Sequence, residues 1–251
     1  MSGHSKWASI KHKKAAIDAK RGKLFSRFSK EITVAAKCGG GDPDMNPRLR
    51  TAIITAKAAN MPNDNIDKAI KKGTGELPGV SYEECIYEAY APGGVAILIE
   101  VMTDNKNRTT AELRSIITKR NGNMASANAV AWMFAKKGFI TIDKGASDED
   151  TVLTAALEAG AEDVKTESDS YEIITAPNDL EAVKESLESK NIEISSAEIT
   201  SIPSTTIPIK NEKDAKQLLD FVEAVEDNDD VQNVYANFDI PDDIMAKLEE
   251  E

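Results

Sequence analysis

The chain has 251 residues, of which 41% are hydrophobic, 29% charged and 5% aromatic, and its formal net charge is −12. This length fits two or three compact domains of roughly 100–200 residues each, and the composition is that of a globular protein. An apolar run of the roughly 18–20 residues needed to span a bilayer is missing, as is the apolar core of a secretory signal. We therefore expect a cytoplasmic protein with no membrane partner.

The charge is distributed very unevenly along the sequence. Residues 1–75 contain 16 Lys or Arg and 6 Asp or Glu, a net charge of +10, whereas the remaining residues contain 15 and 37, a net charge of −22. A basic head thus precedes an acidic body that repels polyanions. This imbalance predicts that an anionic partner binds the head.

The head has the pattern of a small helical domain, with helices expected at residues 15–37, 47–60 and 63–73. The apolar residues of the first helix fall within about 80° of one another at 100° per residue; they are Ile17, Leu24, Phe28, Ile32 and Ala35. Asn46 followed by Pro47 is typical of a helix start. The Gly- and Pro-containing residues 73–79 predict an interdomain linker.

After the linker the hydrophobic period changes from 3.6 to 2, which indicates strands. A hairpin is expected at residues 86–102, with its turn at Pro92-Gly93-Gly94. A helix should follow from about Thr110, because Thr109 and Glu112 have the spacing of a capping box.

The next segment has the order βαββαβ, with strands expected at 138–143, 161–166, 171–175 and 192–199 and helices at 148–159 and 178–189. This is the ferredoxin-like order. A final strand, helix and strand at 205–209, 212–225 and 231–238 cannot bury a sheet alone. We therefore expect an α+β protein with a three-helix domain (1–76), a discontinuous α+β domain (77–132 plus 203–251) and a ferredoxin-like domain inserted into it (133–202).

A basic stripe is the leading candidate for a nucleic-acid contact. Its members are spaced three, four and three residues apart, roughly 125° from the centre of the apolar face; they are Lys20, Lys23, Arg27 and Lys30. The full candidate set adds Lys6, Trp7, Lys11, Lys13, Lys14 and Arg21. Contacts of this kind to phosphates give salt-sensitive affinity with little sequence preference. The competing interpretation is a solvated helix face.

Two further features have two interpretations each. Trp7 can stack on an unpaired base or pack as a tether on the helical domain. The loop with Asn105, Lys106, Asn107 and Arg108 precedes a helix, where backbone N–H groups and the helix dipole attract anions. Its Asn and Asp residues equally suit turns and caps.

Signs of catalysis are weak. The sequence has no glycine-rich phosphate loop, no HExxH and no GxSxG motif, and its two cysteines and two histidines show no metal-ligand spacing. We expect no catalytic residue, no metal site and no cofactor. The remote alternative is a metal-dependent phosphoryl-transfer enzyme, whose carboxylates would assemble only in three dimensions and whose activity a chelator would abolish.

Several motifs in order resemble the YebC/PmpR family: Gly3-His4-Ser5-Lys6-Trp7, Tyr87-Glu88 with Pro92-Gly93-Gly94-Val95, Thr103-Asp104-Asn105 with Asn107-Arg108-Thr109, and Val130-Ala131-Trp132-Met133-Phe134. The resemblance extends over the whole chain. It implies a three-domain protein, a helical head followed by two α+β domains, with a role in gene expression.

The resemblance implies two different roles. Bacterial relatives are described as transcriptional regulators that bind promoter DNA, whereas other members act in translation and associate with ribosomes. Readers of DNA sequence normally place Arg, Asn or Gln against base edges, while the stripe here is mainly lysine and suits phosphate in DNA or ribosomal RNA. We expect a DNA-binding transcriptional regulator, with a ribosome-associated translation factor as the alternative. The sequence leaves the oligomeric state open.

Overall fold

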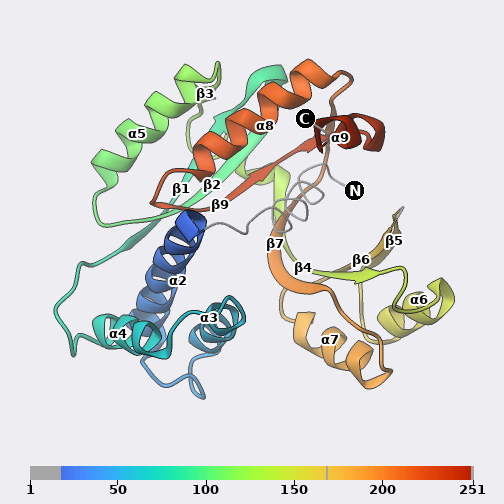
Figure 1. Ribbon diagram of the computed structural model, residues 1–251, viewed down its shortest axis with the longest axis horizontal. Helices are drawn as coiled ribbons and strands as arrows, with labels where there is room; N and C mark the ends of the chain where they lie inside the picture. The colour runs from blue at the N-terminus through green and yellow to red at the C-terminus, as the bar shows by residue number, and fades with distance from the viewer. Residues whose placement is uncertain (1–17, 168, 250–251) are drawn as a thin grey trace. The chain divides into compact units, whose positions relative to one another are not determined.

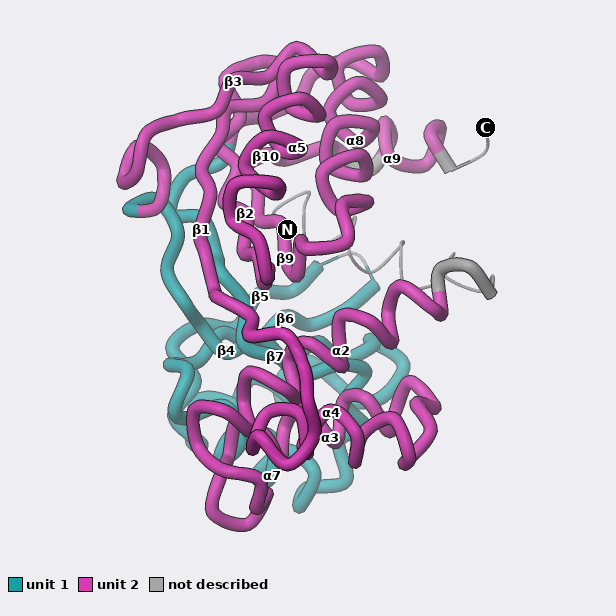
Figure 2. The backbone as a smooth tube through the Cα atoms, turned by 90° about the vertical axis from the view of Figure 1, so that its left-hand side faces the viewer, with its two compact units in different colours: residues 1, 132–206 teal, residues 2–131, 207–251 magenta. Residues whose placement is uncertain are grey.

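The computed structural model describes residues 18–167 and 169–249, which form two compact units (Figure 1, Figure 2). Unit 1 comprises residues 132–206, and unit 2 comprises the described residues before and after it. The chain therefore leaves unit 2 and returns to it. The helical head and the first sheet share unit 2, so the separate domain boundary expected near residue 76 stays a prediction.

Three helices form the head: α2 (Asp18–Gly39), α3 (Pro47–Ala58) and α4 (Asn63–Thr74). Their core contains the fully buried Ile32 and Leu49. At the start of α3, the Asn46 side chain accepts a hydrogen bond from the Leu49 N–H at 3.1 Å and donates to the Ala35 carbonyl at 2.8 Å. Asn46 thus caps one helix and ties it to another. Leu24, which its spacing places on the apolar face of this helix, is 38% exposed and lies outside that core.

The sheet of unit 2 has the strand order β3-β1-β2-β9. Its members are β1 (Glu83–Tyr90), β2 (Ala96–Thr103), β3 (Asn123–Met124) and β9 (Val231–Ala236). The predicted hairpin is β1 and β2, joined by the short 3-10 turn η1 (Pro92–Gly94). Gly93 and Gly94 both have positive φ, 80° and 76°, which favours glycine.

Helices α5 (Lys106–Lys119) and α8 (Glu212–Glu226) lie along this sheet (Figure 1). They bury Leu113, Phe221 and Val222 against Ile97 and Ile99, and all five side chains have no exposed surface. The remaining elements of unit 2 are β8 (Ile207–Pro208), β10 (Phe238–Asp239) and α9 (Asp242–Glu249). The end of the chain thus completes the core that residues 83–124 begin.

Unit 1 has the strand order β5-β6-β4-β7, and all neighbouring strands are antiparallel. Its elements in chain order are η2 (Ala131–Met133), which begins one residue before the unit, then β4 (Phe134–Asp143), α6 (Glu149–Glu158), β5 (Asp163–Thr166), β6 (Ser170–Thr175), α7 (Leu180–Ser189) and β7 (Ser196–Pro203). This is the ferredoxin-like arrangement of βαββαβ. The predicted fold class, a helical head followed by α+β domains with one inserted in the other, is confirmed.

The predicted start of α5 is wrong. The helix begins at Lys106, and its N-cap is Asn105, whose side chain accepts from the Arg108 N–H at 3.1 Å. Thr109 lies inside the helix and is fully buried. Its hydroxyl therefore does not cap the helix, because it is committed to a buried contact described below.

The strand predicted at residues 192–199 is also misplaced, because β7 begins at Ser196. Ile192 is 3% exposed, and Ile194 packs beside it against the core of unit 1. Ile192 is buried and Ile194 is partly buried in the loop before β7, so their alternation does not mark a strand. The strand predicted at 231–238 is split at Asn237, whose side chain accepts from the Ala96 N–H at 2.7 Å.

Candidate nucleic-acid interface

Three members of the predicted basic stripe contact an acidic loop of the same unit. We call residues 226–230 the acidic loop; its sequence is Glu-Asp-Asn-Asp-Asp, and it joins α8 to β9. Lys23 lies beside Asp227, with its ammonium 3.0 Å from the carboxylate and also bonded to the backbone carbonyl. The Arg27 guanidinium donates to the Glu226 carbonyl. One face of α2 is thus docked on four acidic residues.

Lys30 is the most deeply placed member of the stripe. Its ammonium lies 2.7 Å from Asp230 Oδ1 and 2.8 Å from the Asp229 carbonyl, with the Met102 carbonyl at 3.3 Å. The Lys30 and Asp230 side chains are only 11% and 6% exposed. This ion pair is therefore shielded from solvent, unlike Lys23 and Asp227, whose side chains are 26% and 72% exposed.

Arg27 is held by burial as well as by charge. Burial lowers the pKa of its guanidinium, and the negative charges of Glu226, Asp227 and Asp229 oppose that shift. The Nε atom of Arg27 is buried without a hydrogen-bond partner among the described residues. The Arg27 guanidinium is therefore engaged in the intramolecular contact and is not exposed for a partner.

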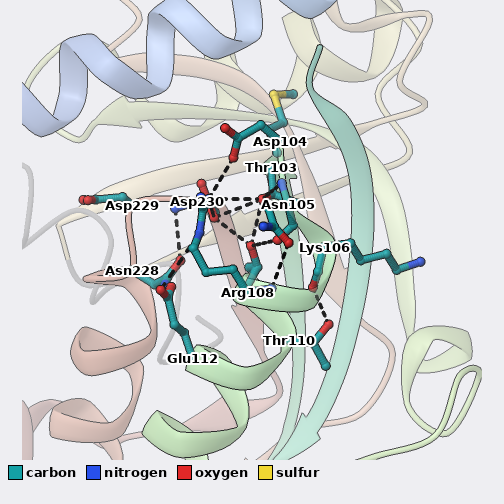
Figure 3. A network of polar contacts seen from close by, with 12 residues as sticks. Thr103, Asp104, Asn105, Lys106, Arg108, Thr110, Glu112, Asn228, Asp229 and Asp230 are labelled. Carbon is teal, nitrogen blue, oxygen red and sulfur yellow. Dashed lines mark hydrogen bonds and ion pairs between the residues drawn. The ribbon is translucent and has the colours of Figure 1, made fainter. Parts of the chain in front are cut away.

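Asp230 lies at the centre of the contact, as Figure 3 shows. Its Oδ2 atom accepts from Arg108 at 2.7 Å, from the Thr109 hydroxyl at 2.7 Å and from the Thr103 hydroxyl at 3.1 Å. Burial raises the pKa of Asp230, but the hydrogen bonds from Lys30, Thr109 and Arg108 outweigh it and bring the pKa well below its usual range. The carboxylate is thus kept charged by donors from α2 and α5.

The other members of the candidate set lie elsewhere. The Arg21 side chain is exposed, with its guanidinium carbon 5.7 Å from the centre of the Phe25 ring. The side chain of Lys20 is outside the described residues. So are five residues of the N-terminal segment, namely Lys6, Trp7, Lys11, Lys13 and Lys14.

The predicted anion-binding loop lies at the first turn of α5 and already holds an intramolecular anion. Arg108 donates to Asp104 at 2.9 Å in addition to Asp230, and its hydrogen bonds to these two carboxylates raise its pKa. Asn105 caps the helix, while Lys106 and Asn107 are exposed. The adjacent groove, about 780 Å³ in volume, is lined by Glu112, Asp227 and Asp229 among others and is unfavourable to a phosphate.

A second ion-pair network links the head to the sheet of unit 2. Arg48 on α3 binds Glu31 on α2 at 2.8 Å and Glu84 on β1 at 2.7 Å. The hydrogen bonds that Arg48 donates to Glu84 and Glu31 raise its pKa. Arg48 is therefore not an available phosphate ligand.

Sequence reasoning missed the acidic loop as a partner of the stripe. The available signal was a run of four carboxylates within five residues, Glu226 to Asp230, in a chain that also has a row of cations at helical spacing. About 200 residues separate the two segments, so no local pattern pairs them. Among the described residues, no group of three or more His, Cys, Asp or Glu side chains is arranged to hold a metal ion. No described helix is long and apolar enough to cross a membrane.

Comparison with known proteins gives a consistent result over the whole length. Residues 5–76 match the family model of the TACO1/YebC protein N-terminal domain, and residues 82–238 match that of the TACO1/YebC second and third domain. A probable transcriptional regulatory protein of Dictyoglomus turgidum is 57% identical over 249 residues, covering 99% of this chain and 100% of the relative. One of Desulforapulum autotrophicum is 59% identical over 248 residues, with the same coverage.

A solved structure is similar as well. The crystal structure of a conserved hypothetical protein from Aquifex aeolicus is 48% identical in sequence, with a TM-score of 0.79. The alignment covers 90% of this chain and 93% of that one. The similarity of structure thus extends over most of both chains.

Proposed function

The chain belongs to the TACO1/YebC family, and on that premise we propose that it is a nucleic-acid-binding regulator of gene expression rather than an enzyme. In its more specific form, the proposal is a cytoplasmic DNA-binding regulator of transcription that acts through the basic N-terminal domain. The observation that carries it is the charge separation, +10 in residues 1–75 against −22 in the rest. The names of the relatives, probable transcriptional regulatory proteins, support it.

Only some of the candidate residues are proposed to contact phosphate. Lys23, Arg27 and Lys30 already bind the acidic loop, and breaking a buried pair such as Lys30 with Asp230 costs about 3–5 kcal/mol. The residues proposed to contact phosphate are Lys6, Lys11, Lys13, Lys14, Lys20 and Arg21. Trp7 is proposed to stack on an unpaired base.

A translation factor bound to ribosomal RNA is the second candidate, and the composition of the head favours it. Residues 1–75 contain 12 Lys but only 4 Arg. Lysine is a flexible point charge suited to backbone phosphate, whereas bidentate recognition of bases favours arginine. Such a head accepts the backbone of RNA as readily as that of DNA.

Crosslinking the protein in cells and sequencing the attached nucleic acid separates the two candidates. Enrichment of promoter DNA supports transcription, and enrichment of ribosomal RNA supports translation. Recovery of neither would defeat both. In vitro, reversing four charges in Lys6→Glu, Lys11→Glu, Lys13→Glu and Lys14→Glu should abolish binding of a labelled oligonucleotide. The matched control reverses the charge of four exposed lysines of the body, Lys119, Lys144, Lys210 and Lys213. It should bind the oligonucleotide with an affinity close to that of the unmodified protein.

A further inference from the structure

A groove between α2 and α4 is lined by several side-chain hydrogen-bond donors. It has a volume of about 160 Å³ and is lined by Ser29 and Thr33 of α2, Asn65, Lys68 and Lys72 of α4, and Tyr82 of the following segment. This is several times the roughly 30 Å³ that one water molecule occupies in the liquid. The groove therefore has room for a small polar group together with water.

Among the described residues, no carboxylate pairs with the positive charge at the groove. Lys68 and Lys72 are both exposed and lie one turn apart on the same side of α4. Asp64 and Asp67 belong to the same helix, but within the described chain no carboxylate lies within 4.0 Å of either ammonium. The two lysines thus differ from Lys23 and Lys30, whose charges are paired.

Three neutral donors line the same groove. In the described part of the chain, the Ser29 hydroxyl, the Asn65 amide and the Tyr82 hydroxyl have no hydrogen-bond partner, whereas Thr33 already donates to the Ser29 carbonyl at 2.7 Å. The Tyr82 ring lies 5.6 Å from the Lys30 ammonium. Burial, with the charges of Asp104 and Asp230, raises the pKa of Tyr82, so its hydroxyl stays protonated and able to donate.

The helix dipole explains only part of this arrangement. Lysines in the last turn of a helix are stabilised by the negative end of the dipole, and this accounts for Lys71 and Lys72. It does not account for Lys68, nor for the donors contributed by α2 and by the segment after α4. Two ammonium groups and three neutral donors, with no acceptor carboxylate lining the groove, are the complement of an oxyanion.

We infer that the groove between α2 and α4 is a phosphate-binding subsite of the head, with Lys68 and Lys72 supplying the charge and Ser29, Asn65 and Tyr82 the neutral hydrogen bonds. The ligand is a backbone phosphate of nucleic acid, so the inference rests on the proposed function. The subsite would add phosphate contacts from α4, whose Lys68 and Lys72 do not contact the acidic loop. The chemistry is the same for DNA and RNA.

The test removes the charge of the two lysines in the full-length chain and measures binding against salt concentration. The probes are a fluorescein-labelled single-stranded RNA and a labelled duplex DNA. In the Lys68→Gln/Lys72→Gln variant, the negative slope of log K against log salt should become shallower by about 1.8 on duplex DNA and about 1.4 on single strands. Over a tenfold decrease in salt concentration, the affinity of the unmodified protein should therefore rise about 60-fold more than that of the variant on duplex DNA, and about 25-fold more on single strands.

The control is Lys119→Gln/Lys213→Gln, which changes the net charge equally at exposed positions on α5 and α8. It should keep the slope of the unmodified protein, and both variants should melt as that protein does. If the affinity of the Lys68/Lys72 variant falls for only one probe, the result supports the subsite and shows whether RNA or DNA supplies the phosphate. If the unmodified protein binds but the Lys68/Lys72 variant matches the control, the subsite is refuted while the proposed function stands. If the unmodified protein binds neither probe, the proposed function itself has failed.

Discussion

The ammonium of Lys30 lies 2.7 Å from the carboxylate of Asp230, although 200 residues separate them in the chain. Both side chains are nearly inaccessible, and the same carboxylate also binds Arg108 and Thr109 on α5. This single residue therefore joins the basic helix of the head to the α+β part of unit 2.

Breaking the pair on one side should destabilise unit 2 strongly. Asp230→Ala leaves Lys30 buried without its counter-charge, and the expected loss is about 3–5 kcal/mol of unfolding free energy. Denaturant unfolding of the single variants and of Lys30→Met/Asp230→Ala measures the coupling. The double variant should lose less than the two single variants added together; strict additivity would show that the two charges do not interact.

The contact should also make stability depend on acidity. The pKa of Asp230 is lower in the folded chain than in the unfolded one, so the unfolded state binds the proton first as pH falls. The stabilisation of the folded state by Asp230 is therefore complete above the unfolded-state pKa, near 4. It is lost as the pH drops through the folded-state pKa. Thermal melting from pH 6 to pH 2 should show a decline that is weaker in Asp230→Asn. If the melting temperatures of the unmodified protein and of Asp230→Asn declined in parallel with pH, Asp230 would not be the source of the pH dependence.

Glu88 should order the segment that leads out of unit 2. Its carboxylate accepts from the backbone N–H groups of Asn128 at 2.6 Å, Val130 at 2.6 Å and Ala131 at 2.9 Å. Burial raises the pKa of Glu88, but these hydrogen bonds outweigh it and lower the pKa. Glu88→Gln should weaken the contact by about 1.5–3 kcal/mol and speed hydrogen exchange at those three amides. The exposed Glu83→Gln on the same strand is the control and should leave the exchange unchanged.

The close approach of α2 and α4 should not tolerate a side chain at Gly73. A Cβ added there would lie 2.7 Å from the Ala36 Cβ and would also overlap the Thr33 carbonyl. Gly73→Ala should therefore cost about 1–3 kcal/mol through overpacking. Gly22→Ala, where an added Cβ meets nothing within 4 Å, should instead stabilise α2 by up to about 1 kcal/mol. Equal melting temperatures for the two variants would contradict this packing.

Sequence patterns determined the order of the elements well because helix and strand periods are local properties. The βαββαβ run of unit 1 and the Asn46-Pro47 helix start could be predicted from neighbouring residues alone. The family resemblance on the N-terminal and hairpin motifs also agrees with the family models. The prediction at Thr109 was wrong because its hydroxyl bonds Asp230, which is distant in sequence. The prediction at Ile192 was wrong because this residue reaches the core from a loop and not from a strand.

The assignment of the basic residues was decided only by the tertiary structure. The sequence determined that the head is basic and the body acidic, since that needs only counting. Which cations remain available depends on where the chain folds back, and the acidic loop returns to Lys23, Arg27 and Lys30 while Lys68 and Lys72 have no carboxylate partner in the described chain. Charge adds up along a sequence, but the pairing of charges is set by distances of a few ångströms, because Coulomb interactions weaken with separation and with solvent screening.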